Sequence, residues 1–275
     1  MVSDIIFYIE DLKSKFAKID TSKYYLAYSG GRDSHFILWF IKNILKDNNI
    51  KVVSINTLME HPEIKQRMID HADLVLLPLR KHKDIKEEFG IPCFTKQQDD
   101  HIHRYQKGSR AKSTIDFIHG NKKTMFKMSK KPRELLLSNN LHKVSSKCCD
   151  YLKKEPFKKF EKETGLKPIV CIRSTESIMR NKFKSCFNKN GMFTPIWDLP
   201  DKLLKQIEEH YNIEIPSVYD TVIRTGCMGC PYGRNIEKEL GLLTNAQKKF
   251  IIEYFKESYT VKGICIKQKT IGEYE

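Results

Sequence analysis

The chain has 275 residues, of which 40% are hydrophobic and 30% charged, and its formal net charge is +15 at pH 7. This length suits one large α/β domain, or one domain and a smaller one, and the composition excludes a disordered chain. No apolar run reaches about 18 residues, which excludes a membrane-spanning helix. Residues 1–20 mix acids and bases along an apolar stripe, unlike a signal peptide. We therefore expect a cytoplasmic protein with a polyanionic partner or substrate.

In chain order, the first half alternates short apolar strands with helices. The predicted strands are residues 24–28, 51–56, 74–77 and 168–172. The predicted helices are residues 1–20, 35–47, 61–71, 84–89, 113–118, 131–137, 198–211 and 247–259. Short buried strands separated by helices predict a parallel sheet with helices on both faces.

A Gly-rich turn, Ser29-Gly30-Gly31-Arg32-Asp33-Ser34, joins the first strand to the next helix. Such a turn makes backbone N–H groups face an anion, and its glycines let phosphate approach without a Cβ in the way. The spacing excludes the G-x-x-x-x-G-K-S/T phosphate loop. The alternative is a plain turn with an Asp or Ser helix cap. Asp33 suits both a cap and the binding of Mg²⁺ on the phosphates.

A basic stretch, residues 104–147, holds about two thirds of the excess charge, because it has twelve Lys or Arg residues and two acids, a net charge of +10. The basic residues are Arg104, Lys107, Arg110, Lys112, Lys122, Lys123, Lys127, Lys130, Lys131, Arg133, Lys143 and Lys147. Tyr105, Phe117 and Phe126 lie among them, which suits base stacking or a small core. The stretch favours a nucleic acid as partner, and the alternative is a solvated basic face.

Two cysteine pairs predict one four-thiolate site. Cys148 and Cys149 are adjacent, and Cys227 and Cys230 form a C-x-x-C-P loop. Zinc fits four thiolates, but a vicinal pair and the Cys-Pro ending fit a 4Fe–4S cubane better. A redox pair at the C-x-x-C loop is the remaining alternative. The other cysteines, Cys93, Cys171, Cys186 and Cys265, are expected to be buried or loop thiols.

These motifs together resemble the phosphoadenosine phosphosulfate (PAPS) reductase family, within the adenine nucleotide α-hydrolase-like superfamily. The resemblance rests on Ser29–Ser34, Asn56–Glu63, Cys148-Cys149 with Lys153 and Pro156, Arg173-x-x-Glu176-Ser177, Tyr219-Asp220 and Arg224–Tyr232. The order S-G-G-x-D-S looks like the loop of the N-type ATP pyrophosphatases, which hold the β,γ-pyrophosphate of ATP. The cysteine pattern resembles the 4Fe–4S site of the assimilatory adenylylsulfate reductases. The DNA phosphorothioation ATPase of this family is similar in carrying both features.

The resemblance implies a doubly wound, mostly parallel sheet with an adenine nucleotide α-hydrolase-like core. It implies an N-terminal helix (residues 1–22), a nucleotide-binding α/β domain (23–180) with a basic insertion (101–147), and a C-terminal helical region (181–275) carrying the cluster loop. The implied ligands are ATP with Mg²⁺ and a 4Fe–4S cluster. The implied site residues bind nucleotide (Ser29, Gly30, Gly31, Arg32, Asp33, Ser34, Asn56), act in catalysis (Asp33, Arg173, Glu176, Arg180) or bind metal (Cys148, Cys149, Cys227, Cys230).

Two departures from the family pattern decide the expected reaction. The chain ends in Gly263-Ile264-Cys265-Ile266-Lys267 and lacks the Glu-Cys-Gly-x-His segment of the sulfonucleotide reductases, and its Gly-rich loop is intact. We therefore expect an enzyme that adenylates a substrate, with nucleic acid favoured, for transfer of sulfur from a donor that the sequence does not name. The alternatives are a sulfonucleotide reductase with an external thiol donor and a non-catalytic nucleic-acid-binding module.

Overall fold

A computed structural model of the chain describes residues 2–120, 127–176, 185–188, 191–222 and 225–264. The chain forms two compact units that are interleaved in sequence. The first unit comprises residues 1–78 and 155–225, and the second comprises residues 79–154 and 226–275. These units differ from the three consecutive domains expected from the sequence. Residues 79–154 were expected to be part of the domain 23–180, but they belong to the second unit. No helix among the described residues is both long and apolar enough to cross a membrane.

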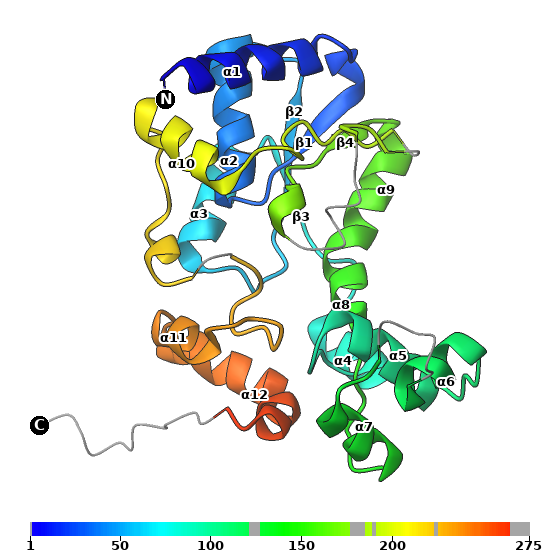
Figure 1. Cartoon of the computed structure of the whole chain (residues 1–275). Coiled ribbons are helices and arrows are strands. Elements are labelled where there is room, and N and C mark those ends of the chain that lie inside the picture. Colours follow the sequence, from blue (N-terminus) through cyan, green and yellow to red (C-terminus); the bar gives the residue numbers. More distant parts are fainter. Residues whose placement is uncertain (1, 121–126, 177–184, 189–190, 223–224, 265–275) are drawn as a thin grey trace, which may run out of the picture. The chain divides into compact units, whose positions relative to one another are not determined.

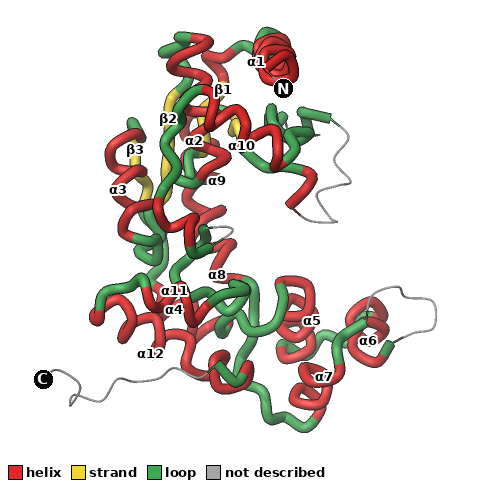
Figure 2. Tube along the Cα trace, turned by 60° about the vertical axis from the view of Figure 1, so that its left-hand side comes forward, coloured by secondary structure: helices red, strands yellow, loops and turns green. Residues whose placement is uncertain are grey.

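The first unit is built on a four-stranded parallel sheet in the order β3-β2-β1-β4 (Figure 1). Its strands are β1 (Tyr24–Ala27), β2 (Lys51–Ile55), β3 (Leu74–Leu76) and β4 (Lys167–Ile169). Leu26 of β1 lies opposite Val52 of β2 and Ile169 of β4. All four strands were predicted, but β4 begins one residue earlier than expected and ends three residues earlier. The strands drawn in Figure 2 all belong to this unit.

Both faces of this sheet are covered by helices, because successive side chains of β1 point to opposite faces and Tyr24, Tyr25 and Leu26 are all buried. Tyr24 and Leu26 join a core with α1 (Val2–Phe16), α2 (Arg32–Trp39) and α10 (Asp201–His210). Tyr25 points to the other face, where α9 (Glu155–Thr164) packs Phe157 and Phe160 against its ring at 5.9 and 5.1 Å between centroids. The predicted α/β class with a parallel, doubly covered sheet is confirmed.

The remaining segments of the first unit connect these elements. They are η1 (Thr21–Lys23), the π-helical η2 (Phe40–Leu45) that continues α2, α3 (Pro62–His71), η4 (Ser174–Glu176) and η6 (Ser217–Asp220). The helices predicted after the Gly-rich turn and after the second strand correspond to α2 with η2 and to α3.

In its described residues the second unit consists of helices and loops. Its helical segments are α4 (His82–Phe89), α5 (Lys96–Gln106), α6 (Lys112–His119), α7 (Lys130–Leu137), α8 (Lys147–Cys149), η3 (Asp150–Lys154), α11 (Ile236–Gly241) and α12 (Asn245–Lys262). A small core that includes Cys93, Ile102, Phe117 and Val144 lies among α5, α6 and α7. Helix α12 begins with a capping box between Thr244 and Gln247 and ends at Gly263, whose φ is 71°.

Candidate functional site

The Gly-rich turn lies between β1 and α2, at the carboxyl end of the sheet. Gly31 is the N-cap of α2 and has no side chain to bond the first free N–H groups of the helix. Ser34 braces the turn instead, because its hydroxyl accepts from the Ser29 amide at 3.2 Å and donates to the Gly31 carbonyl at 3.0 Å. The Ser29 hydroxyl lies 3.0 Å from that of Ser34. The turn is thus fixed from within, and it leaves helix N–H groups for another acceptor.

A side chain at either glycine of this turn would meet close neighbours. Gly30 has a φ of 70°, and a Cβ there would lie 2.8 Å from the carbonyl oxygen of Ile64 in α3. A Cβ on Gly31 would lie 2.9 Å from the Tyr219 hydroxyl oxygen and 3.2 Å from Thr225 Oγ1. Close approach of backbone therefore requires glycine at position 30, whereas at position 31 a side chain would have to displace two side-chain hydroxyls.

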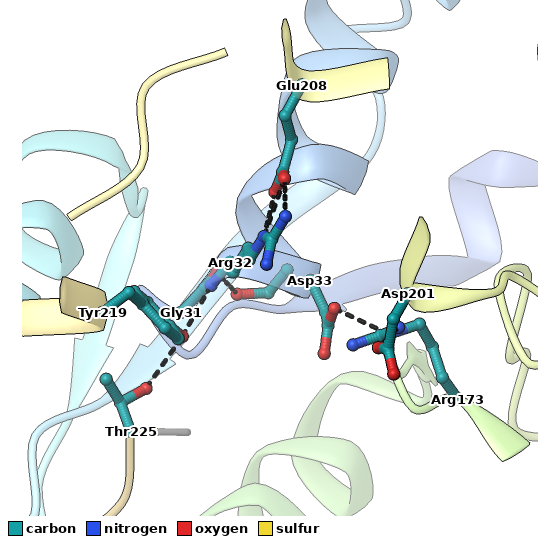
Figure 3. Close-up of polar contacts among 9 residues, drawn as sticks. Gly31, Arg32, Asp33, Arg173, Asp201, Glu208, Tyr219 and Thr225 are labelled. Atoms are coloured by element: carbon teal, nitrogen blue, oxygen red, sulfur yellow. Dashed lines mark hydrogen bonds and ion pairs between the residues drawn. The ribbon is translucent and has the colours of Figure 1, made fainter. Parts of the chain in front are cut away.

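One N–H group of the turn already has a partner from η6. The Arg32 amide donates to Tyr219 Oη at 2.9 Å, and that hydroxyl lies 3.1 Å from Thr225 Oγ1 (Figure 3). Burial is the main cause that raises the pKa of Tyr219, so the side chain is a neutral phenol at physiological pH. The carboxylate of Glu63 in α3 accepts from the Ser217 amide at 2.8 Å and so fixes the start of η6.

The side chain of Arg32 points away from the turn, toward α10 (Figure 3). Its Nε donates to the two carboxylate oxygens of Glu208 at 2.6 and 2.7 Å, and its Nη2 also contacts that carboxylate. The Glu208 side chain is only 2% exposed. Burial raises the pKa of Glu208, and Arg32 opposes that shift. Arg32 therefore anchors the start of α2 to α10 through its side chain.

The structure brings together two of the predicted catalytic residues. Arg173 Nε lies 2.9 Å from Asp33 Oδ1, and Arg173 Nη1 also pairs with Asp201 at the start of α10. Arg173 is only 8% exposed, whereas the Asp201 side chain is 73% exposed, so the carboxylates that balance the buried guanidinium reach from it to the surface. Glu176 is the last residue of η4, and Arg180 lies outside the described residues.

Asn56 follows β2 at the same carboxyl edge of the sheet. Its side-chain Oδ1 accepts from the Leu58 amide at 2.9 Å, and its backbone N–H donates to the Leu76 carbonyl at 3.0 Å. The bond between Oδ1 and the Leu58 amide closes a turn in which Leu58 has a φ of 65°. In the described conformation Asn56 shapes the loop after β2.

The four predicted metal ligands all lie in the second unit, although the two pairs are far apart in sequence. Cys148 is buried at α8, while Cys149, Cys227 and Cys230 are half-buried. A hydrogen bond between the two thiols is the main cause that raises the pKa of Cys148 when it pairs with Cys149. The nearby Cys230 and Cys227 raise this pKa further. The four thiols are thus within electrostatic reach of one another. Among the described residues, however, no group of three or more His, Cys, Asp or Glu side chains is arranged to hold a metal ion.

Positive charge also surrounds this cysteine cluster. The hydrogen bond from the Cys148 thiol is the main cause that lowers the pKa of Cys149 to about 6. The positive charges of Lys96, Lys153 and Lys154 also lower it. Burial chiefly raises the pKa of Cys230 to about 12. Within the adjacent pair, Cys149 is therefore the thiol that more readily becomes a thiolate, the form that binds metal.

The C-x-x-C-P loop is held by two different helices. The Cys230 amide donates to the Cys227 carbonyl at 3.1 Å, and Tyr259 of α12 donates to the Gly229 carbonyl. Just after the loop, the Tyr232 hydroxyl donates to Asp99 Oδ2 of α5 at 2.7 Å. The fully buried Asp99 also accepts from the amides of residues 93 and 94 at 2.7 and 3.0 Å. The sequence analysis did not identify Asp99, whose only local signal is its place in the first turn of a helix.

The basic stretch forms exposed helices around the small core of the second unit. Phe117 is buried and stacks against His101 with centroids 4.1 Å apart, so it is a core residue and not a platform for bases. Tyr105 carries the Arg110 guanidinium over its ring at 4.1 Å. Among the described basic residues, Lys107, Lys112 and Lys131 are exposed and make no ion pair. Lys122, Lys123 and Phe126 lie outside the described residues.

Comparison with known proteins finds similar folds only among solved structures, because no family model and no curated protein matches. A PAPS reductase of Candida auris in complex with phosphate is 15% identical, has a TM-score of 0.38, and covers 78% of this chain and 83% of its own. An NH3-dependent NAD synthetase of Campylobacter jejuni with nitrate is 12% identical, with a TM-score of 0.37 and coverages of 96% and 97%. A U34-tRNA thiolase of Methanococcus maripaludis with its 4Fe–4S cluster is 12% identical, with a TM-score of 0.36 and coverages of 97% and 84%. The first of these three bears the name of the family that the motifs resemble.

Proposed function

We propose that this chain is an ATP pyrophosphatase-type enzyme that adenylates a substrate and so prepares it for sulfur transfer. The observation that carries the proposal is the turn at Gly30 and Gly31. Both positions leave little room for a Cβ, and the N-cap residue Gly31 has no side chain to cap the helix that follows. A turn of this build offers N–H groups and a helix dipole to the β and γ phosphates of ATP.

The residues around the turn suit charge neutralisation more than proton transfer. Backbone N–H groups would hold the departing pyrophosphate, and Arg173 would face the charge that develops at the α-phosphate. Asp33, which pairs with Arg173, would position that guanidinium or bind Mg²⁺, which would neutralise phosphate charge when bound. An acceptor oxygen then forms a bond to the α-phosphorus while the bond to the β-phosphate oxygen breaks, and pyrophosphate leaves.

The second step of the proposed reaction is sulfur transfer. A sulfur nucleophile would displace the adenylated oxygen, so that a carbon–sulfur bond forms and AMP leaves. Cys148, Cys149, Cys227 and Cys230 are the residues that would hold a 4Fe–4S cluster, which would carry sulfur or electrons or brace the loop. Their donor set fits this group, because four soft sulfur ligands share one unit and shift one another's pKa values.

Nucleic acid is the favoured acceptor because the second unit carries exposed lysines without ion pairs, Lys107, Lys112 and Lys131. An isolated excess of positive charge on helices attracts a phosphate backbone. The two alternatives keep the same fold: reduction of a sulfonucleotide by an external thiol, and binding of nucleic acid without turnover.

Pyrophosphate release from ATP separates these functions, measured with and without RNA or DNA. Only the adenylating enzyme releases pyrophosphate, whereas sulfite release from a sulfonucleotide would favour the reductase, and salt-sensitive binding without turnover would favour the module. Gly31→Val should abolish release, because a side chain there would collide with Tyr219 and block phosphate. Gly165→Ala is the control, since Gly165 lies at the amino end of the strands with nothing within 4 Å of a Cβ. Equal pyrophosphate release by wild type and Gly31→Val would refute ATP binding at this turn.

A further inference from the structure

The Tyr219 hydroxyl lies at the N-terminus of α2, where an anionic ligand of the turn would bind. Tyr219 Oη accepts from the Arg32 amide at 2.9 Å, which is the distance of an ordinary N–H···O bond. The same oxygen lies 2.9 Å from the position of a Cβ on Gly31. A phenol oxygen therefore lies against the turn at Gly31 and at the first N–H group of the helix.

This placement has several independent supports within the first unit. Thr225 Oγ1 bonds the hydroxyl at 3.1 Å. The flanking Val218 and Val222 pack with Ile64 and Met68 of α3, and Tyr219 packs against the same cluster. Glu63, also in α3, accepts from the Ser217 amide, from the Ser217 hydroxyl at 3.0 Å and from the Val218 amide at 3.0 Å. The contact at Arg32 is therefore built into the packing of η6 on α3.

We infer that the Tyr219 hydroxyl is an internal competitor for the anion site, one that ligands must displace from the Arg32 amide. A neutral phenol is a weaker acceptor than a charged phosphate oxygen, so a ligand with several phosphate oxygens can replace it. A weak monoanion gains too little to do so. Tyr219 would thus set a threshold of binding energy that a ligand with several phosphate oxygens passes and a simple anion does not. The inference rests on the proposed binding of ATP phosphates at this turn.

Calorimetric titration with inorganic pyrophosphate tests the inference on the full chain. Tyr219→Phe keeps the ring and its packing but removes the competing oxygen. We expect binding about three- to tenfold tighter than wild type, the fold-change that corresponds to the loss of one net hydrogen bond. Binding of inorganic sulfate should tighten by a similar factor, because every anion at this site must displace the same hydroxyl. Unchanged or weaker pyrophosphate binding in Tyr219→Phe would overturn the inference and make the hydroxyl a bystander or a ligand donor.

Matched controls separate this inference from the proposed function. Tyr8→Phe removes another largely buried tyrosine hydroxyl of the same unit, one bonded to Asp198 at 3.2 Å, and should leave binding unchanged. Pyrophosphate binding to wild type that Gly31→Val abolishes supports the site, whatever Tyr219→Phe does. If folded wild type and Tyr219→Phe both fail to bind, both the site and the inference are wrong.

A second variant and a second measurement cover the case in which Tyr219→Phe does not fold. Thr225→Val removes the anchor of the hydroxyl and should also tighten pyrophosphate binding, by a smaller factor. Hydrogen exchange of the Arg32 amide, followed by NMR without ligand, should be faster in Thr225→Val than in wild type. Equal exchange rates together with equal affinities would overturn the inference.

Discussion

Gly30→Ala should destabilise the first unit more than the same change at another glycine with the same backbone conformation. Gly30 has a φ of 70° and Gly165 a φ of 72°. A Cβ on Gly30 would lie 2.8 Å from the Ile64 carbonyl oxygen and 3.0 Å from Ile64 Cγ2, whereas a Cβ on Gly165 would meet nothing within 4 Å. The pair therefore separates the cost of the backbone conformation from the cost of the collision with α3.

The expected losses follow from these two costs. An alanine in the left-handed region costs about 1–2 kcal/mol, and the entropy that the unfolded chain loses returns about 0.4–1 kcal/mol. Gly165→Ala should therefore lower the free energy of unfolding by about 1 kcal/mol. At Gly30 the obstacle is a backbone oxygen that cannot rotate away, and forced overpacking adds about 1–3 kcal/mol. Gly30→Ala should thus cost about 2–4 kcal/mol in total.

Urea unfolding followed by tryptophan fluorescence measures this difference in the right part of the chain. The chain has two tryptophans, and Trp39 and Trp197 both lie in the first unit. The signal therefore reports that unit even if the two units unfold separately. Equal losses of stability in Gly30→Ala and Gly165→Ala would show that the turn does not contact α3 as described, and would refute the argument for a rigid turn.

Three further predictions concern the second unit. The protein should be brown when purified without oxygen, and Cys227→Ser should lower its iron content; a colourless wild type with one zinc per chain would contradict the cluster. Replacing Lys107, Lys112 and Lys131 by Glu should make nucleic-acid binding less sensitive to salt, without changing ATP binding. The slope of log K against log salt concentration should become shallower by about 0.7–0.9 for each phosphate group that is no longer neutralised. Burial is the main cause that raises the pKa of Asp99 to about 6. Because this value lies above the pKa of the unfolded chain, the stabilising contribution of Asp99 is present below about pH 4 and lost as pH rises through about 6. Hydrogen exchange corrected for intrinsic rates should show this loss in wild type and not in Asp99→Asn.

Local patterns were sufficient to predict most elements of the fold. Each strand is a short apolar run, and the Gly-rich turn marks where the first strand gives way to a helix. Helix α9 was not predicted, because only Phe157 and Phe160 mark its buried face and its other positions are mostly charged. The fourth strand ends earlier than its apolar run, because β4 pairs with β1 over only three residues. Pairing length depends on the neighbouring strand and not on the run itself.

The candidate site was predicted from sequence only where its residues form motifs. Ser34, Asp33 and Arg173 were identified, whereas Glu208 and Asp201 were not, since nothing in an amphipathic helix shows which of its acids faces a distant arginine. The bond between Tyr219 and the Arg32 amide links residues that are 187 positions apart. Contacts of this kind depend on tertiary packing, which a single sequence does not display.

The interleaving of the two units constrains the order in which a ribosome can complete them. Strand β1 lies between β2 and β4, so one of its edges stays unpaired until residue 169 has been synthesised, after the whole segment 79–154. Residue 225 is the last of the first unit, and Cys227 and Cys230 follow it in the chain. Because synthesis proceeds from the N-terminus, the first unit is complete before the last two thiols emerge. A metal centre held by all four cysteines can therefore be loaded only onto a chain whose first unit has already been made.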